Sequence, residues 1–268
     1  MSTSVIPAEI CGYTVESALT AGQSYLAIGP GGRGIVLKRL DPDCLLGGLL
    51  HPSIRERLLR VRELAHGGVA NLHGVGREGE QAYLIWEYVA GQTFDQYVDA
   101  DNRTPRDLLV VARELILSVD SLHMQGIVHG AIGGGNVIVA RDGSVRLTHI
   151  SPLLYSDMAV DAEAVIALLE QAVERRGEQG SPLGQLLAEA SREQMELRAL
   201  GAKVAALLDS RDDPHEPHVQ AQERNLRRQI LFAALILAIM GLALGYAIWR
   251  AVEGGSNLHG VGGWPVGG

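Results

Sequence analysis

Hydrophobic and polar residues alternate along the first part of the chain with the period of β-strands. Residues 13–40 place apolar side chains at about every second position and contain a Gly-Pro-Gly-Gly turn, which predicts strands joined by a tight connection. Residues 54–65 have helical spacing instead. Two further short strands are expected near 71–78 and 81–89.

The second part of the chain changes to helical spacing. Residues 107–125 form a strongly amphipathic pattern that predicts a long helix. Two short strands, at 136–140 and 145–150, flank an Arg-Asp-Gly-Ser turn. Residues 160–208 are helical with a break at 175–182. A chain that begins with strands and ends mostly with helices predicts an α+β fold with two lobes.

One later segment is apolar on every face of a helix. Residues 230–249 contain no charged side chain, and a helix of that length spans roughly 30 Å, the thickness of a bilayer core. We therefore predict a single transmembrane helix. Arg224, Arg227 and Arg228 precede this segment and Arg250 alone follows it. The positive-inside rule then predicts a cytoplasmic N-terminal domain at the cell membrane and a short C-terminal tail outside.

Two glycines in this segment lie on one helical face. Gly241 and Gly245 are four residues apart, and such a small-xxx-small pair lets two helices approach closely. The pair is compatible with a homodimer, and equally with an ordinary helix that faces lipid.

These patterns divide the chain into five parts. We predict an N-terminal tail over 1–12, an α+β domain over 13–208 and a polar, Pro-interrupted juxtamembrane linker over 209–229. The transmembrane helix follows over 230–249, and a Gly-rich extracytoplasmic tail over 250–268.

Composition narrows the classes of function. The chain has 268 residues, of which 47% are hydrophobic and 20% charged, which is enough for a packed core. Its net charge of −8 excludes a general nucleic-acid binder, because phosphates require a basic surface. Cys11 and Cys44 match no metal-ligand spacing and are interpreted as reduced packing residues. Only Lys38 and Lys203 are lysines among 23 basic residues, which draws attention to Lys38.

Several segments occur in the order typical of one family. "IVLKRL" carries Lys38, "LAHGGVANLHGVG" follows, and "YLIWEYVAGQTFDQYV" carries Glu87 and Val89. "SLHMQGIVHGAIGGGNVIV" comes next and contains Asn136, and Asp161 begins the following helix. This order resembles the protein kinase family, especially bacterial Ser/Thr kinases with a membrane anchor. The resemblance implies a two-lobed fold, here with a reduced C-lobe. It also implies that Lys38 faces nucleotide phosphates and that Glu87 to Val89 face adenine.

The chain departs from this family where the chemistry is carried out. Ala131 stands where the resemblance places the carboxylate that accepts the substrate's hydroxyl proton, and a methyl group cannot accept a proton. His149 stands at the position of the Mg²⁺-binding Asp, and a neutral imidazole is a poor ligand for a hard cation. Gly133 replaces the basic residue that faces the phosphate. Asn136 keeps the family's residue type.

Further departures concern nucleotide binding. The glycine-rich lid is shortened to "TAGQS", and Trp86 at the back of the adenine pocket is expected to narrow it. The family's acidic partner of the lysine falls on Arg57, so we expect Lys38 to pair with the neighbouring Glu56. Residues 151–161 are too few for an activation segment of the usual length.

These departures decide the expected function. Loss of a general base costs roughly 10²–10⁴ in rate, and loss of the metal removes several kcal/mol of charge stabilisation. We therefore interpret the chain as a membrane-anchored pseudokinase without catalytic residues, metal or cofactor. It would act as a scaffold or regulatory module for a protein partner, such as a kinase or its substrate. The alternatives are a divergent active Ser/Thr kinase or an ATP-binding sensor that uses Lys38 and Asn136, and an unrelated α+β domain.

Overall fold

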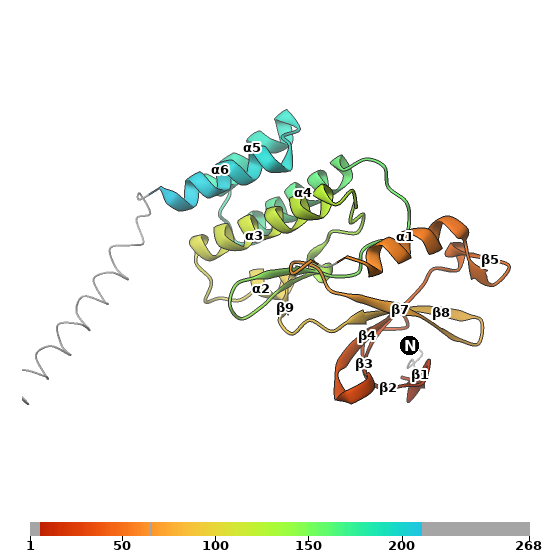
Figure 1. Ribbon diagram of the computed structural model, residues 1–268. Helices are drawn as coiled ribbons and strands as arrows, with labels where there is room; N and C mark the ends of the chain where they lie inside the picture. Colours follow the sequence, from red (N-terminus) through yellow and green to blue (C-terminus); the bar gives the residue numbers. More distant parts are fainter. Residues whose placement is uncertain (1–5, 65, 211–268) are drawn as a thin grey trace, which may run out of the picture. The chain divides into compact units, whose positions relative to one another are not determined.

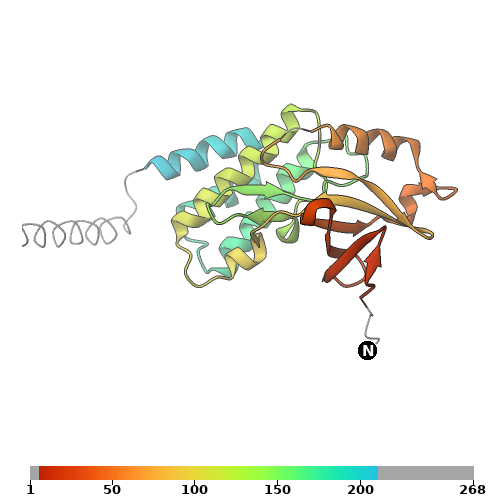
Figure 2. The ribbon, with the colours of Figure 1, turned by 60° about the horizontal axis from the view of Figure 1, so that its bottom comes forward.

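The structure, a computed structural model, describes residues 6–64 and 66–210. In this part a lobe built mainly of strands adjoins a lobe built mainly of helices (Figures 1 and 2). The predicted transmembrane segment 230–249, and most of the predicted linker, lie outside the described residues. Among the residues that are described, no helix has the length and hydropathy needed to span a bilayer.

The sheet lobe is one antiparallel sheet of six strands in the order β1-β2-β3-β4-β8-β7. Its strands are β1 (Glu9–Ile10), β2 (Tyr13–Thr20), β3 (Ser24–Ile28), β4 (Gly34–Arg39), β7 (Leu72–Glu78) and β8 (Gln81–Glu87). The strands predicted from alternation are confirmed. The sheet begins at Glu9, however, because β1 pairs with β2 inside the stretch that we predicted as a tail.

Strand alternation decides what each face of the sheet carries. On β4, Ile35 and Leu37 belong to a small cluster on one face, whereas Val36 belongs to the main core on the other. Lys38 follows two residues after Val36 and therefore projects on the main-core face. This register directs the lysine towards the region between the lobes.

Helix α1 (Pro52–Arg62) packs against β7 of the sheet lobe (Figure 1). The chain before α1 forms a hairpin of β5 (Leu45–Leu46) and β6 (Leu49–Leu50). The hydrophobic periodicity did not predict this hairpin. Its turn consists of Gly47 and Gly48, which both have positive φ and so suit glycine. Leu46 and Leu49 are exposed by 65% and 69% at this turn.

The helical lobe confirms the long helices predicted from periodicity. It contains α2 (Phe94–Val98), α3 (Pro105–Met124), α4 (Ala159–Arg175), α5 (Pro182–Glu193) and α6 (Leu197–Asp209). A three-stranded sheet joins the lobes in the order β11-β10-β9, with β9 (Gln92–Thr93), β10 (Val137–Val139) and β11 (Val145–Leu147). Helix α3 begins with a capping box between Thr104 and Asp107, which satisfies its first free N–H groups.

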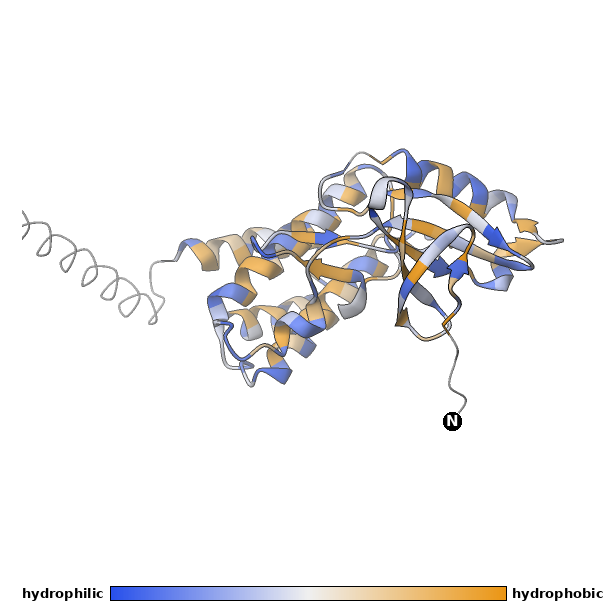
Figure 3. Cartoon of the chain, turned by 90° about the horizontal axis from the view of Figure 1, so that it is seen from below, coloured by the Kyte–Doolittle hydropathy of each residue, from blue (hydrophilic) through white to orange (hydrophobic). Residues whose placement is uncertain are grey.

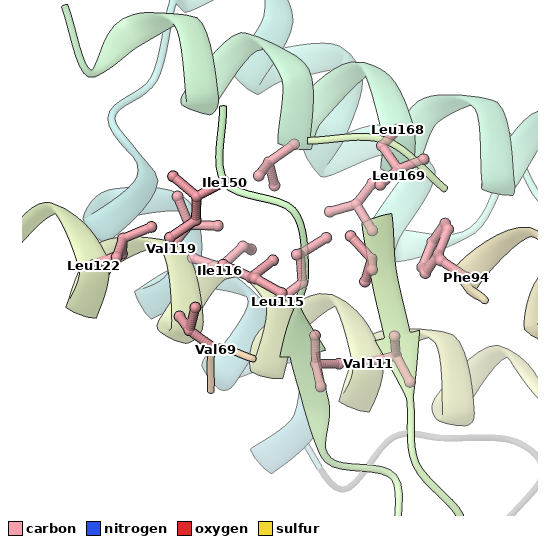
Figure 4. Close-up of a cluster of buried hydrophobic side chains, with 14 of the residues drawn as sticks. Val69, Phe94, Val111, Leu115, Ile116, Val119, Leu122, Ile150, Leu168 and Leu169 are labelled. Atoms are coloured by element: carbon pink, nitrogen blue, oxygen red, sulfur yellow. The ribbon is translucent and has the colours of Figure 1, made fainter. Parts of the chain in front are cut away.

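One apolar core connects the helical lobe to the sheet lobe. Val111, Leu115, Val119 and Leu122 lie along one face of α3 and are completely buried (Figure 4). Their spacing of three and four residues makes a continuous stripe on the helix. In Figure 3 strands and helices both carry hydrophobic segments between hydrophilic ones, as this packing requires.

Candidate functional site

The loop between α3 and β10 contains the residues that the sequence singled out. The side chain of His129, near the start of this loop, is fully buried. Nε2 of His129 donates to the carbonyl oxygen of Thr148 at 3.1 Å, and Nδ1 accepts the backbone N–H of Ala131 at 3.2 Å. Burial lowers the pKa of His129 to about 4, so the ring is neutral at pH 7. His129 therefore supports the loop and is not placed as a catalytic base.

Asp161, at the start of α4, holds this loop from behind and is completely buried. Its carboxylate accepts the backbone N–H groups of His129 at 2.6 Å and Gly130 at 2.8 Å, and Nε2 of His123 at 2.8 Å. Burial would raise the pKa of Asp161, but the hydrogen bonds from His123 and the two backbone groups lower it below its ordinary value. The charged carboxylate is therefore fully satisfied.

The side chain of Asn136 closes the loop from the other end. Nδ2 of Asn136 donates to the carbonyl oxygen of Ala131 at 2.7 Å. Oδ1 of the same amide lies 3.2 Å from Nδ1 of His149. Because an amide oxygen can only accept, Nδ1 of His149 carries the proton and Nε2 carries the lone pair. Asn136 thus uses both ends of its amide inside the protein.

His149 is held in an uncommon backbone conformation. Its φ is 60°, in the left-handed region that non-glycine residues rarely adopt. Its ring packs edge-on against Trp86, with ring centroids 5.9 Å apart. Burial lowers the pKa of His149 to about 3, and the charges of Lys38 and His129 lower it further. The imidazole is neutral at pH 7.

These donors do not fit Mg²⁺. Mg²⁺ prefers oxygen ligands in octahedral geometry, commonly from carboxylates and phosphates. Here the two side chains at the expected ligand positions are an imidazole and an amide, and they hydrogen-bond to each other. In the parts of the chain that are described, no group of three or more His, Cys, Asp or Glu residues could hold a metal ion.

Lys38, Ala131 and His149 come together in the structure. They line one cavity of about 400 Å³ between the lobes. The same cavity is lined by Asp41 and Asp43, two carboxylates on the turn after β4 that the sequence analysis did not single out. Oδ1 of Asp41 accepts the backbone N–H of Asp43 at 2.9 Å, which makes a local turn. Ala131 therefore lies in the cleft, in a cavity that Lys38, Asp41 and Asp43 also line.

The predicted pair between Lys38 and Glu56 is wrong. No carboxylate of a described residue lies within ion-pair distance of Lys38, and Glu56 is exposed on α1. Burial lowers the pKa of the Lys38 ammonium group. The physical reason is helical geometry, because neighbouring residues on a helix point about 100° apart and α1 turns the next residue inward.

That next residue is Arg57, which is only 7% exposed. Nε of Arg57 donates to the carbonyl oxygen of Ser151 at 2.7 Å, and Nη2 donates to that of Val128 at 2.6 Å. Burial lowers the pKa of Arg57, while the charge of Asp161 raises it. Arg57 therefore connects α1 to the loop and to the segment that follows β11. Being a cation itself, it cannot replace the acidic partner of Lys38.

Glu87 and Val89, the residues that the resemblance places next to adenine, lie apart from this cavity. The carboxylate of Glu87 accepts Nη2 of Arg146 and the backbone N–H of Asn71, both at 3.0 Å. Val89 is half-buried against the main core. Trp86, near the end of β8, is completely buried. Neither Glu87 nor Val89 lines the cavity with Lys38.

The lid and the activation segment are both short. Between β2 and β3 only three residues form the turn, with Gly22 at φ 69°. After β11, the chain reaches α4 through residues 148–158. The ring of Tyr155 occupies the space that a side chain at Gly130 would need. Gly130 also has a φ of 67°, so two independent features favour glycine at this position.

Comparisons with known proteins agree with this architecture. Residues 51–159 match a family described as protein tyrosine and serine/threonine kinase. The probable serine/threonine-protein kinase PknB of Lactococcus lactis is 30% identical over 119 residues, which is 44% of this chain and 19% of that protein. The serine/threonine-protein kinase PrkC of Bacillus subtilis is 26% identical over 117 residues, or 43% of this chain and 18% of that protein.

The chain thus spans about a fifth of the length of these curated relatives. Among solved structures, a double mutant of the Mycobacterium tuberculosis PknI kinase domain superimposes with a TM-score of 0.58 at 18% identity. That match covers 78% of this chain and 99% of the PknI domain chain. The curled sheet, the loop held by Asp161 and these matches together show that the described part of this chain has a protein kinase-like fold.

Proposed function

We propose that this kinase-like domain does not catalyse phosphotransfer and acts as a binding or regulatory module for a protein partner. One observation carries the proposal: Ala131 lines the cleft, while His149 and Asn136 bond to each other where a metal would be held. A general base contributes roughly 10²–10⁴ in rate. Phosphoryl transfer depends almost entirely on positioning and charge stabilisation, and at the two positions where the family has a carboxylate this chain has Ala131 and His149.

The cleft geometry also argues against tight ATP binding. Lys38 is left without a bridging acid on α1, the glycine-rich lid is a tight turn, and Trp86 near the end of β8 is completely buried. We propose that the apolar segment 230–249 tethers this module to the cell membrane, with the domain on the cytoplasmic side. A tethered module raises the local concentration of whatever it binds.

A phosphotransfer assay tests the proposal. The full chain is incubated with labelled ATP, with Mg²⁺ or Mn²⁺, and with itself and a generic protein substrate. We expect no transfer above that of heat-treated protein. Turnover that disappears in Lys38→Ala but persists in Lys203→Ala would overturn the proposal. Lys203 is the matched control because it is the other lysine, on the surface of α6, where it pairs with Glu189.

A second candidate rests on Asp41 and Asp43, the two carboxylates that line the cavity with Lys38. They could serve a divergent ATP-binding sensor or active kinase. A thermal shift assay with ATP separates the candidates, because saturation near 100 times Kd stabilises a protein by about 2.7 kcal/mol. A metal-dependent shift that is lost in Asp41→Asn/Asp43→Asn would favour the second candidate. We expect no shift at millimolar ATP.

A further inference from the structure

A long groove lies on the helical lobe, away from the cleft. Two adjoining cavities of about 610 and 600 Å³ form it, and they share Ala159, Ala162, Gln194 and Met195. Helix α4 supplies the floor, and the ends of α3, α5 and α6 supply the walls. From the shared residues the groove continues in both directions, so it is one continuous surface.

The floor of the groove is apolar and made of small or adaptable side chains. Ala159, Ala162 and Ile166 follow each other along α4 at spacings of three and four residues, and Ala167 is next to Ile166. Small residues on one helix let another helix approach closely. Along this line, from residue 159 to residue 170, α4 rises about 17 Å, or about three turns. The floor therefore has the length of a short helix.

Methionines form the wall at one end. Met124, Met158 and Met195 all line the first cavity, and Met124 and Met158 are exposed by 70% and 41%. Methionine is unbranched and polarisable, so it adapts to different apolar partners and is overused on surfaces that bind amphipathic helices.

Carboxylates form the rim. Asp157, Glu163, Glu170 and Glu196 line the groove, and none of the four forms an ion pair with a described residue. A further acid, Asp120, is already paired with Arg198, which is the only Arg or Lys among the described residues that line the groove. The groove thus combines an apolar floor with a negative rim. An anionic lipid surface or an acidic peptide would be repelled by it.

From this combination we infer that the groove is a docking site for a cationic amphipathic helix of a partner protein. The partner would place apolar residues at i, i+3, i+4 and i+7 on the floor and Arg or Lys residues against the rim. The inference states which kind of protein segment the partner in the proposed function would present to this domain. Only this choice of a protein partner rests on the proposed function. It does not require the cleft to bind or to release any ligand.

Direct binding of a designed probe tests this docking site. The full chain is held in lipid nanodiscs, which accommodate its apolar segment, and titrated into a fluorescein-labelled peptide. The peptide has leucines on one helical face and arginines on the other. A control peptide has the same composition in an order that gives no apolar face. We expect fluorescence anisotropy to report micromolar binding of the first peptide, at least about tenfold tighter than the control, and weaker binding as salt increases.

Matched charge reversals locate the binding site. Glu163→Arg/Glu170→Arg changes two rim carboxylates, whereas Glu16→Arg/Glu174→Arg makes the same change in net charge on exposed residues outside the groove. We expect the first variant to lose at least about tenfold in affinity and the second to lose less than about twofold. Circular dichroism and thermal melting check that both variants are folded.

Three results would overturn the inference. Equal losses in both variants would mean non-specific attraction between the peptide and an acidic protein. Equal binding of both peptides would mean that the apolar floor has no role. Occupation of the groove by a second copy would appear as a change in mass, measured by light scattering, in the rim variant alone. None of these results bears on phosphotransfer, so failure here leaves the proposed function to be judged by its own assay.

Discussion

The two sides of the loop at residues 129–136 differ sharply in how their polar groups are satisfied. On the inner side, Asp161 receives three hydrogen bonds and His129 receives and donates one each. On the side that faces the cleft, Ala131 presents a methyl group and Lys38 has no carboxylate partner among the described residues. The comparison shows that the hydrogen bonds that hold this kinase-like loop lie mainly on its inner side, away from the cleft.

The largest loss of stability should follow from removing the Asp161 carboxylate on the inner side of the loop. Asp161→Ala would remove the acceptor for two buried backbone N–H groups and leave His123 without a partner. We expect a loss of about 3–5 kcal/mol in the free energy of unfolding, measured by urea denaturation. Glu163→Ala, at an exposed position of the same helix, should change stability by less than about 0.5 kcal/mol. A small loss for Asp161→Ala would mean that the loop does not depend on this carboxylate.

The pH dependence of stability should sharpen the comparison. His129 and His149 have folded-state pKa values of about 4 and about 3, lowered by burial from 6.5. As pH falls below about 6.5, the unfolded chain binds these protons first, so stability is lost between about pH 6.5 and the folded pKa values. We expect a loss of a few kcal/mol between pH 7.5 and pH 4.5, measured by urea denaturation.

The same experiment on variants assigns this loss. His149→Gln removes one of the two buried rings, so the slope of stability against pH should fall by roughly half. His73→Gln changes an exposed histidine on β7 and should leave the slope unaltered. The carboxylate of Asp161, whose pKa is lowered, contributes a further loss only at lower pH. A slope that is the same in all three proteins would show that His149 is not buried and neutral.

A smaller effect is expected where α1 meets the loop. Arg57→Met keeps much of the side-chain volume but removes the donors to the carbonyl oxygens of Ser151 and Val128. We expect a loss of about 2 kcal/mol, because buried acceptors are left unsatisfied. Arg55→Met, on the exposed face of the same helix, should have an effect within about 0.5 kcal/mol. Equal effects of the two changes would indicate that Arg57 does not anchor α1.

The smallest effect should come from the lysine of the cleft. Lys38→Met replaces a desolvated ammonium group by an apolar side chain of similar length. Because Lys38 has no acid partner among the described residues, we expect the free energy of unfolding to increase by up to about 1 kcal/mol. Thermal melting of the variant and of Arg39→Met, its exposed neighbour, would measure this difference. A clear loss of stability would mean that Lys38 has a structural partner after all.

The sequence was sufficient to predict the strands and helices whose hydrophobic residues recur at regular spacing. Alternation around Lys38 and the helical stripe of residues 107–125 both corresponded to real elements. These predictions succeeded because each depends on local geometry or on spacing within a continuous segment.

Other features depend on contacts that no local pattern contains. Glu56 was chosen over Arg57 on charge alone, but the rotation of α1 on the sheet decides which residue points inward. The hairpin at residues 45–50 is too short for a periodic signal. Asp41 and Asp43 reach the cavity only because the chain turns after β4, and the groove on α4 depends on how three other helices pack around it.

The hydrogen bond between Asn136 and His149 has a practical consequence for anyone who handles this domain. The shape of the cleft is set by the protein's own side chains, so neither a chelator nor added divalent salt should alter its folding. Spectra recorded in EDTA and in millimolar magnesium should therefore superimpose. A chemist who looks for small molecules that bind here should screen for compounds that are complementary to a cation and a neutral imidazole, rather than for analogues of a metal–phosphate complex.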